Sequence, residues 1–299
     1  VAVTGVQTCA LPISDFSGLK ICYNNIMNIN TKTFVVTGAA SGIGRAITLS
    51  LLKQGAEVAA VDLKKENLEL LKKDCAEWAD KLSLHELNIT DKKGVAKLPD
   101  EVIKMHGQVD GLINNAGIIQ PFVKVNDLDY EAIERVMNVN FYGMLYMTKA
   151  FLPVLLKRSI AHIVNVSSMG GFLPVPGQTI YGASKAAVKL FTEGLGAELT
   201  STNVGVTVVF PGATATNITK NSGVKSPISE EAAKSSKIPT QSADDVAALV
   251  VKAIVKNQPR VFAGKDSKAM DRIYRISPSY ATSLVAKQMS ELLKDKRSE

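Results

Sequence analysis

The sequence predicts an α/β protein in which helices cover both faces of a seven-stranded parallel sheet, a three-layer, doubly wound arrangement. From Thr33 onward, short apolar runs rich in β-branched residues alternate with segments whose apolar residues recur at helical spacing. Runs that are apolar throughout are typical of parallel strands buried on both faces. A glycine-rich turn at 37–44 directly follows the first run, as in folds of this class.

The elements follow one another in regular alternation. The expected strands are 33–38, 57–62, 81–89, 109–117, 161–168, 204–212 and 259–264. The expected helices are 43–54, 66–79, 91–106, 127–157, 184–201 and 242–257. The long fourth helix is predicted to start at an Asp cap, and the last one is predicted to be capped by Ser242. Parallel neighbours require right-handed crossovers, and ligands of such sheets bind at the carboxyl ends of the strands.

We expect one domain over residues 31–265. Its least patterned stretch, 213–240, is predicted to be a loop over the site, because loops this long are usually lids or disordered. The tail at 266–299 is basic and partly amphipathic, so we expect a helical extension that packs on a partner subunit, covers the pocket or touches a membrane, in that order. Residues 1–30 lie outside the pattern. The first fourteen resemble translated sequencing-adapter read-through, so this segment is expected to be non-native or disordered.

Composition excludes several classes of function. The 299 residues are 46% apolar and 21% charged, with a net charge of +7 that forms no basic block, which argues against nucleic-acid binding. No uninterrupted apolar run reaches the roughly 18–20 residues that a membrane span needs. The three cysteines (Cys9, Cys22 and Cys75) have no metal-ligand spacing, so we expect neither a metal site nor a disulfide framework, and a reducing, cytoplasmic setting.

The turn at 37–44 reads TGAASGIG, with Gly38, Gly42 and Gly44 at the start of the first helix. Glycines allow a tight turn and a close approach of phosphate to the backbone, and the helix N-terminus offers free N–H groups. Asp62 ends the second strand, where a carboxylate can accept hydrogen bonds from ribose hydroxyls and repel a 2′-phosphate. NAD is therefore favoured over NADP, although Lys64 lies close by. A helix-capping role for Asp62 is the alternative.

A second group of residues follows the fifth strand. Tyr181 and Lys185, in YGASK, lie one turn apart if this segment is helical, and Ser168 ends the preceding strand thirteen residues earlier. The three side chains could therefore converge where this fold binds its ligand. The neighbouring Ser167 is the alternative to Ser168, and the thirteen-residue gap favours Ser168.

With these motifs in this order, residues 33–265 closely resemble the short-chain dehydrogenase/reductase family, whose domain is a Rossmann fold. The matching positions are TGAASGIG (37–44), Asp62, Asn88–Ile89, NNAG (114–117), Asn140, Ser168, YGASK (181–185), Pro211–Gly212 and Thr216. Asn140 is preferred to Asn138 because the family's asparagine directly precedes an apolar residue in an N-apolar-x-Gly pattern.

The resemblance implies roles for these residues. Tyr181 would be the general acid/base, with a pKa lowered by the Lys185 ammonium and a cationic nicotinamide. Ser168 would hold the substrate oxygen, and Asn140 a water that connects Lys185 to solvent. The implied cofactor-binding residues are Gly38, Ser41, Gly42, Ile43, Gly44, Asp62, Asn88, Ile89, Asn115, Ala116, Gly117, Tyr181, Lys185, Pro211, Gly212, Thr214 and Thr216.

The sequence therefore leads us to expect an NAD(H)-dependent oxidoreductase that interconverts a secondary alcohol and a ketone. The substrate pocket is expected to be shaped by Ile118–Val123, Met169–Gln178 and the 213–240 loop. Their apolar residues, among them Phe122, Phe172, Leu173, Pro174 and Val175, predict an apolar small-molecule substrate. The alternatives are an NADPH-dependent 3-oxoacyl carrier-protein reductase, against which Asp62 argues, and a catalytically silent dinucleotide-binding regulator, which would be expected to lack Tyr181 or Lys185. Family members commonly pair through the helices expected at 127–157 and 184–201, so we expect a homodimer or homotetramer.

Overall fold

The computed structural model of the chain describes residues 26–225 and 240–290. Its centre is a parallel sheet of seven strands in the order β3-β2-β1-β4-β5-β6-β7, which confirms the predicted fold class. The strands are β1 (Thr33–Thr37), β2 (Glu57–Asp62), β3 (Leu82–Glu86), β4 (Gly111–Asn114), β5 (Ala161–Val166), β6 (Val204–Pro211) and β7 (Arg260–Ala263). From β1 the chain adds β2 and β3 on one side, and from β4 it adds β5 to β7 on the other side, so the strand order changes direction between β1 and β4. The crevice at the carboxyl ends of these two strands is where this topology places a ligand.

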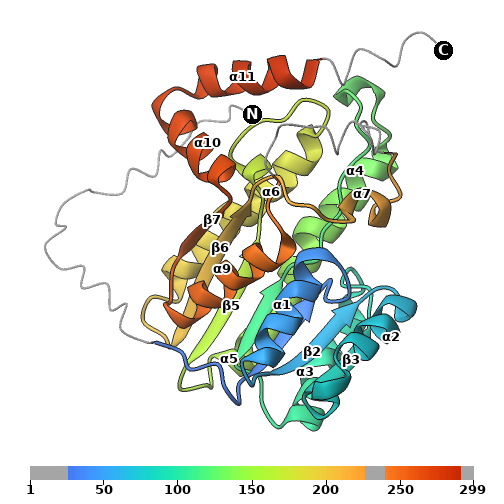
Figure 1. The fold of residues 1–299 in the computed structure, drawn as a ribbon, viewed down its shortest axis with the longest axis vertical. Helices are drawn as coiled ribbons and strands as arrows, with labels where there is room; N and C mark the ends of the chain where they lie inside the picture. The colour runs from blue at the N-terminus through green and yellow to red at the C-terminus, as the bar shows by residue number, and fades with distance from the viewer. Residues whose placement is uncertain (1–25, 226–239, 291–299) are drawn as a thin grey trace, which may run out of the picture.

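Helices form a layer on each face of this sheet (Figure 1). The first layer contains α1 (Gly42–Lys53), α2 (Lys65–Asp74) and α9 (Ala243–Val255), and the second contains α3 (Lys92–His106), α5 (Met144–Leu155) and α6 (Thr179–Glu198). Each layer has its own apolar core. In β1, for example, Phe34 and Val36 belong to the first core and Val35 belongs to the second. This alternation explains why the strand is apolar at every position.

The structure subdivides two of the predicted helices. The segment expected at 66–79 becomes α2 followed by a 3₁₀ helix, Ala76–Lys81. A short 3₁₀ turn, Val125–Asp127, precedes the segment expected at 127–157. That segment then runs as α4 (Tyr130–Met137), a π-helical turn (Asn138–Gly143) and α5. Asp129 occupies the N-cap position of α4, but its side chain makes no capping hydrogen bond.

The amino-terminal end of the domain differs from the sequence expectation. Residues 1–25 lie outside the described part of the chain, but Met27 and Ile29 are buried in the first core, and the Met27 N–H donates to the Val255 carbonyl at 3.1 Å. The expectation of disorder up to residue 30 therefore does not hold for residues 26–30, because Met27 and Ile29 pack in this core beside α9. At the other end, the tail forms α10 (Lys265–Ile276) and α11 (Pro278–Ser290).

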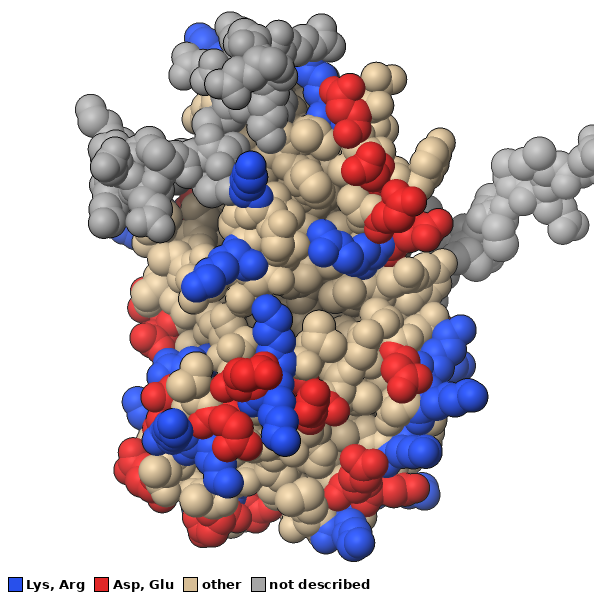
Figure 2. Space-filling model, turned by 90° about the vertical axis from the view of Figure 1, so that its right-hand side faces the viewer, with Lys and Arg blue, Asp and Glu red and all other residues tan. Residues whose placement is uncertain are grey.

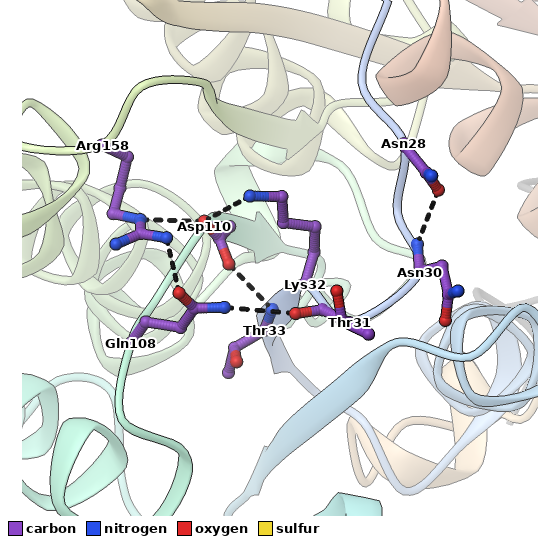
Figure 3. A network of polar contacts seen from close by, with 8 residues as sticks. All are labelled: Asn28, Asn30, Thr31, Lys32, Thr33, Gln108, Asp110 and Arg158. Atoms are coloured by element: carbon purple, nitrogen blue, oxygen red, sulfur yellow. Dashed lines mark hydrogen bonds and ion pairs between the residues drawn. The ribbon is translucent and has the colours of Figure 1, made fainter.

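A buried carboxylate holds together the amino-terminal ends of two central strands, β1 and β4 (Figure 3). Asp110 precedes β4 and is fully buried. It accepts hydrogen bonds from Arg158 Nε at 2.8 Å, from the Thr33 N–H at 3.1 Å and from Lys32 Nζ at 3.3 Å. These contacts join the starts of β1 and β4 to the segment that follows α5, on the edge opposite to the ligand crevice.

The surface in Figure 2 carries both signs of charge, with Lys and Arg side chains interspersed among Asp and Glu. Among the described residues, no helix combines the length and the apolar character that a bilayer crossing requires.

Candidate active site

A cavity of about 400 Å³ lies at the carboxyl ends of the strands, and its walls come from residues that end or follow β1 to β6. The sequence-predicted residues that line it are Gly38, Ser41, Gly42, Ile43, Asp62, Asn88, Ile89, Asn115, Ala116, Gly117, Ser168, Tyr181, Lys185, Pro211, Gly212, Thr214 and Thr216. Gly44 and Asn140 do not line the cavity, but they contact residues that do. The cavity thus brings together two groups of residues that are more than a hundred positions apart in the sequence.

The glycine turn forms one end of the cavity. Gly38 and Gly42 have φ angles of +62° and +52°, which L side chains rarely adopt. A Cβ at Gly44 would collide with the Gly38 carbonyl oxygen, so the helix can begin this close to the turn only with glycine there. Ser41 is the N-cap residue of α1, but its side chain makes no capping bond and instead accepts from Asn221 Nδ2 at 2.9 Å. The first N–H groups of α1 are thus left without a side-chain cap.

Asp62 lines the cavity and also supports the turn. Its carboxylate accepts from the Ala40 N–H at 3.1 Å and from the Lys64 N–H at 3.3 Å. The N-cap position of α2 is occupied by Lys64, so the alternative in which Asp62 caps this helix is wrong. Lys64 itself also lines the cavity, which places one cation beside the carboxylate.

The ends of β1 and β4 are joined by Thr37 and Asn115. Thr37 Oγ1 accepts from the N–H groups of Asn115 and Ala116 at 3.0 and 3.1 Å, and Asn115 Nδ2 donates to the Thr37 carbonyl at 3.0 Å. The Asn115 side chain therefore fixes the glycine turn, in addition to lining the cavity.

Tyr181 and Lys185 lie on the first turns of α6, which begins two residues before the tyrosine. Lys185 is 4% exposed, and its Nζ donates to the Val166 carbonyl at the end of β5 at 2.9 Å. A Cβ on Gly117 would lie 3.0 Å from this Nζ, so the glycine of the NNAG motif leaves space for the lysine. The predicted convergence of Ser168, Tyr181 and Lys185 at one cavity is present in the structure.

Burial acts on the two ionisable groups in opposite directions. It raises the pKa of the Tyr181 phenol above its ordinary value of 10.0, and a hydrogen bond with Ser168 partly counters the rise. Burial lowers the pKa of Lys185 to about 8. Desolvation of the phenolate thus opposes the lowering of the Tyr181 pKa that the resemblance implies for Lys185 together with a cationic nicotinamide.

The structure distinguishes Ser168 from its alternative Ser167, and Asn140 from its alternative Asn138. The Ser167 hydroxyl is buried and donates to the Lys185 carbonyl at 2.7 Å, whereas Ser168 Oγ accepts from the Gly170 N–H at 3.1 Å and contacts Tyr181. Asn140 is 1% exposed and lies in the π-helical turn, while Asn138 is exposed.

The Asn140 side chain links the loop after β4 to α6. It accepts from the Ile118 N–H at 2.8 Å and donates to the Ile118 carbonyl and to Ser184 Oγ, both at 2.9 Å. The single amide group of Asn140 thus binds protein atoms in both of these segments.

The wall after β6 is fixed from the C-terminal helices. Asp266, in the first turn of α10, accepts from the Ala213 N–H at 2.8 Å, and the neighbouring Ser267 donates to the Phe210 carbonyl at 2.9 Å. The Gly212 N–H donates to the Ala263 carbonyl at 2.8 Å. The predicted residues Pro211, Gly212 and Thr214 therefore lie on a segment that α10 holds in place.

The predicted loop at 213–240 is only partly described, because residues 226–239 lie outside the described ranges. Its first part contains a short helix, α7 (Ile218–Asn221), and Ser222 Oγ accepts from the Ile119 N–H at 3.0 Å. Asn217, Ile218 and Asn221 line the cavity, as expected of a loop over the site, although the sequence singled out none of the three because the stretch has no periodic pattern.

The apolar residues named for the substrate pocket, Phe122, Phe172, Leu173, Pro174 and Val175, are not among the residues that line the cavity. Two of them pack against other parts of the protein. Phe172 packs edge-on against Phe210 and Phe262, with ring centroids 5.5 and 6.0 Å apart. Leu173 is 1% exposed and lies in a cluster with Ala281 of α11. They anchor the C-terminal helices and do not line the cavity, because α10 and α11 bring their own apolar surface to this place.

Comparison with known proteins agrees with this geometry. The family model for short chain dehydrogenases matches residues 32–226. The chain is 39% identical over 196 residues to the 3-oxoacyl-(acyl-carrier-protein) reductase FabG of Thermotoga maritima, covering 65% of this chain and 78% of that protein. It is 34% identical over 260 residues to the putative oxidoreductase SadH of Mycobacterium tuberculosis, covering 85% of this chain and 94% of that protein.

A similar solved structure is a short chain dehydrogenase from Burkholderia cenocepacia in complex with NADP, with a TM-score of 0.73 and 28% identity. The likeness covers 87% of this chain and 99% of that one. The cofactor type of the family is thus a nicotinamide dinucleotide. From the fold, the convergent cavity and these matches, we conclude that the chain belongs to the short-chain dehydrogenase family of oxidoreductases that act on CH–OH groups.

Proposed function

We propose that this protein is an NAD(H)-dependent oxidoreductase that interconverts a secondary alcohol and a ketone, with Tyr181 as the general acid/base. The observation that carries the proposal is the cavity itself. It has a phosphate-type glycine turn at one end and Ser168, Tyr181 and Lys185 together at the other.

The residues present fit a nicotinamide dinucleotide. The left-handed glycines and the uncapped N-terminus of α1 offer backbone N–H groups to a pyrophosphate. Asp62 would accept hydrogen bonds from ribose hydroxyls, and its negative charge disfavours a 2′-phosphate. Residues after β4 and β6, including Gly117, Gly212 and Thr214, would hold the rest of the dinucleotide. When bound, the cofactor supplies the hydride acceptor or donor.

The chain's own residues would supply proton transfer and orientation. Ser168 hydrogen-bonds the substrate oxygen and places it within reach of the Tyr181 phenol. During oxidation Tyr181 accepts the alcohol proton, and during reduction it donates one. Lys185, held by the Val166 carbonyl, would supply the positive charge that stabilises the phenolate when it forms. Asn140 would connect this group to solvent through a water.

An apolar substrate remains our proposal, and it rests on two of the segments expected to shape the pocket, 118–123 and 213–240, and not on Phe122, Phe172 or Leu173. Ile118 and Ile218 line the cavity, and they come from the loops after β4 and β6. Carbon-rich side chains at these positions favour a hydrophobic alcohol or ketone over a sugar.

One alternative has a specific observation in its favour. The 39% identity to a 3-oxoacyl carrier-protein reductase and the position of Lys64 in the cavity wall would suit an NADPH-dependent reductase of acyl thioesters. Asp62 opposes it, because its carboxylate would face the extra phosphate. Cofactor preference therefore separates the two functions.

The test is an activity screen of secondary alcohols and ketones with both cofactors. Our proposal predicts turnover of an apolar secondary alcohol with NAD⁺ that exceeds turnover with NADP⁺. Preferential NADPH-dependent reduction of 3-oxoacyl thioesters would instead establish the alternative. Dinucleotide binding without turnover of any alcohol or ketone would favour a silent regulator and contradict both.

A further inference from the structure

A buried glutamine outside the predicted set lies directly behind the start of α6. Gln120 is fully buried, and its Oε1 accepts from the N–H groups of Ile180 and Tyr181 at 2.8 and 3.0 Å. These are N–H groups of the first helical turn, which have no partner inside the helix. The side chain therefore acts as an N-terminal cap, supplied from a loop sixty residues earlier in the sequence.

The helix does not cap itself. Gln178 is in the N-cap position, but its side chain makes no capping bond and donates to the Gln120 carbonyl at 2.9 Å. Gln120 Nε2 donates to the Gly177 carbonyl at 3.1 Å. Both polar ends of the Gln120 side chain are thus satisfied, which fixes its orientation and with it the orientation of the helix start.

The rest of the Gln120 loop has independent anchors. Asn140 holds Ile118 through two hydrogen bonds, and Ser222 accepts from the Ile119 N–H. Removing the Gln120 amide would therefore free the first turn of α6 while the cavity-lining part of the loop stays in place. The consequence should fall on Tyr181, whose backbone N–H is one of the two that Gln120 binds.

We propose that Gln120 is a positioning residue for the reaction: its side-chain oxygen caps α6 and fixes the Tyr181 phenol against Ser168 and the substrate. The inference rests on the proposed function, in which Tyr181 is the acid/base. A shift of about 1 Å in a reacting group can lower the rate about 100-fold, so the cap has a clear kinetic readout.

The main test compares Gln120→Leu and Gln120→Glu with the unchanged protein. Leu has a similar volume but no acceptor, so kcat should fall by about 10- to 100-fold, while the dissociation constant for NADH stays within about threefold. Glu keeps the oxygen that accepts from Ile180 and Tyr181 but loses the Nε2 donor to the Gly177 carbonyl, so kcat should recover only in part and lie between the Leu variant and the unchanged protein. In the ligand-free protein, amide hydrogen exchange at Ile180 and Tyr181 should be faster in the Leu variant.

Ser242→Ala is the matched control, because it removes the N-cap of α9, a helix whose residues do not line the cavity. It should lower thermal stability with no change in kcat. If a folded Gln120→Leu variant keeps kcat within twofold, or if Glu is as impaired as Leu, the proposal is wrong. An equal loss of kcat in the Ser242 control would also overturn it.

The exchange measurement keeps this inference separable from the proposed function. If Tyr181→Phe keeps full turnover, the proposed chemistry fails, whereas faster exchange in Gln120→Leu would still establish the cap. Unchanged exchange in that variant would refute the cap even if the chemistry is correct.

Discussion

At the residue scale, Asp62 is the side chain on which the choice of cofactor depends. Its carboxylate lines the cavity and accepts two backbone hydrogen bonds. We predict that Asp62→Ala narrows the ratio of kcat/KM for NAD⁺ over NADP⁺ by about tenfold or more, because the charge that repels a 2′-phosphate is lost. Asp62→Asn keeps one acceptor for the turn and controls for local damage. An unchanged ratio in both variants would remove Asp62 from the cofactor argument.

His162 makes stability depend on pH. Thr207 donates its hydroxyl proton to the Gln258 carbonyl, so it accepts from His162 Nε2, at 2.7 Å. Burial lowers the pKa of His162 to about 3, whereas the unfolded chain has its ordinary value of 6.5. As pH falls below 6.5 the unfolded state binds the proton first, so the native state loses stability between about pH 6.5 and 3, by on the order of 5 kcal/mol in total.

The check is chemical denaturation at several pH values for the unchanged protein and His162→Gln. The variant should lose less stability between pH 7 and pH 4.5, because Gln keeps an N–H donor for Thr207 but does not titrate. Burial lowers the pKa of His85 as well, so part of the acid sensitivity should remain. Identical pH dependence in the two proteins would exclude His162 as a source.

At the element scale, Ser242 illustrates a cap that could be predicted from the sequence. It precedes α9, and its hydroxyl accepts from the Asp245 N–H at 3.1 Å, as expected. We predict that Ser242→Ala lowers the free energy of unfolding by about 1 kcal/mol, while Ser242→Thr restores it because Thr keeps a hydroxyl that can accept from the Asp245 N–H and donate to its carboxylate. Urea denaturation of the three proteins measures this difference. No loss in the Ala variant would show that the cap makes no net contribution.

Caps supplied from elsewhere in the chain were not predictable in the same way. Local order predicts that Tyr181 and Lys185 share a helix face, but nothing near YGASK indicates that Gln120 holds this helix. The one signal is a polar residue after the apolar pair Ile118–Ile119, and it becomes meaningful only when the loop after β4 meets α6.

Element type was predictable where patterns are long, and element boundaries were less so. All seven strands lie within the predicted ranges, because apolar β-branched runs bounded by turns have few other interpretations. The π-helical turn at Asn138–Gly143 interrupts a pattern that looks uniform in sequence. α7 was missed, because a four-residue helix between Thr- and Asn-rich segments is stabilised by tertiary contacts with the glycine turn and the loop after β4.

At the scale of the whole molecule, the carboxyl ends of the strands form the candidate site, and their amino ends contribute to stability. The cavity lies at the carboxyl ends of the strands, whereas Asp110 with Lys32, Thr33 and Arg158 lies at their amino ends (Figure 3). We predict that Asp110→Ala costs roughly 3–5 kcal/mol of stability, because Arg158 and Lys32 lose a fully buried partner. The dissociation constant for NADH at a temperature where the variant is folded should not change.

Asp74→Ala is the surface control for this variant. Its pair with Arg45 is about half exposed, so its removal should cost less than about 1 kcal/mol. Denaturant titrations together with NADH binding give both quantities. A large change in NADH affinity in Asp110→Ala would contradict this separation between the carboxyl and amino ends of the strands.

The central claim is that the Tyr181 hydroxyl transfers the proton, whereas the affinity of the site for the dinucleotide does not depend on this hydroxyl. The direct test measures turnover and NADH affinity of Tyr181→Phe, beside Tyr142→Phe as a control at an exposed position in the π-helical turn. We predict that Tyr181→Phe lowers kcat by about 100- to 10,000-fold with NADH affinity within about twofold, and that the control changes neither. Tyr181→Phe turning over at the unchanged rate would contradict the account.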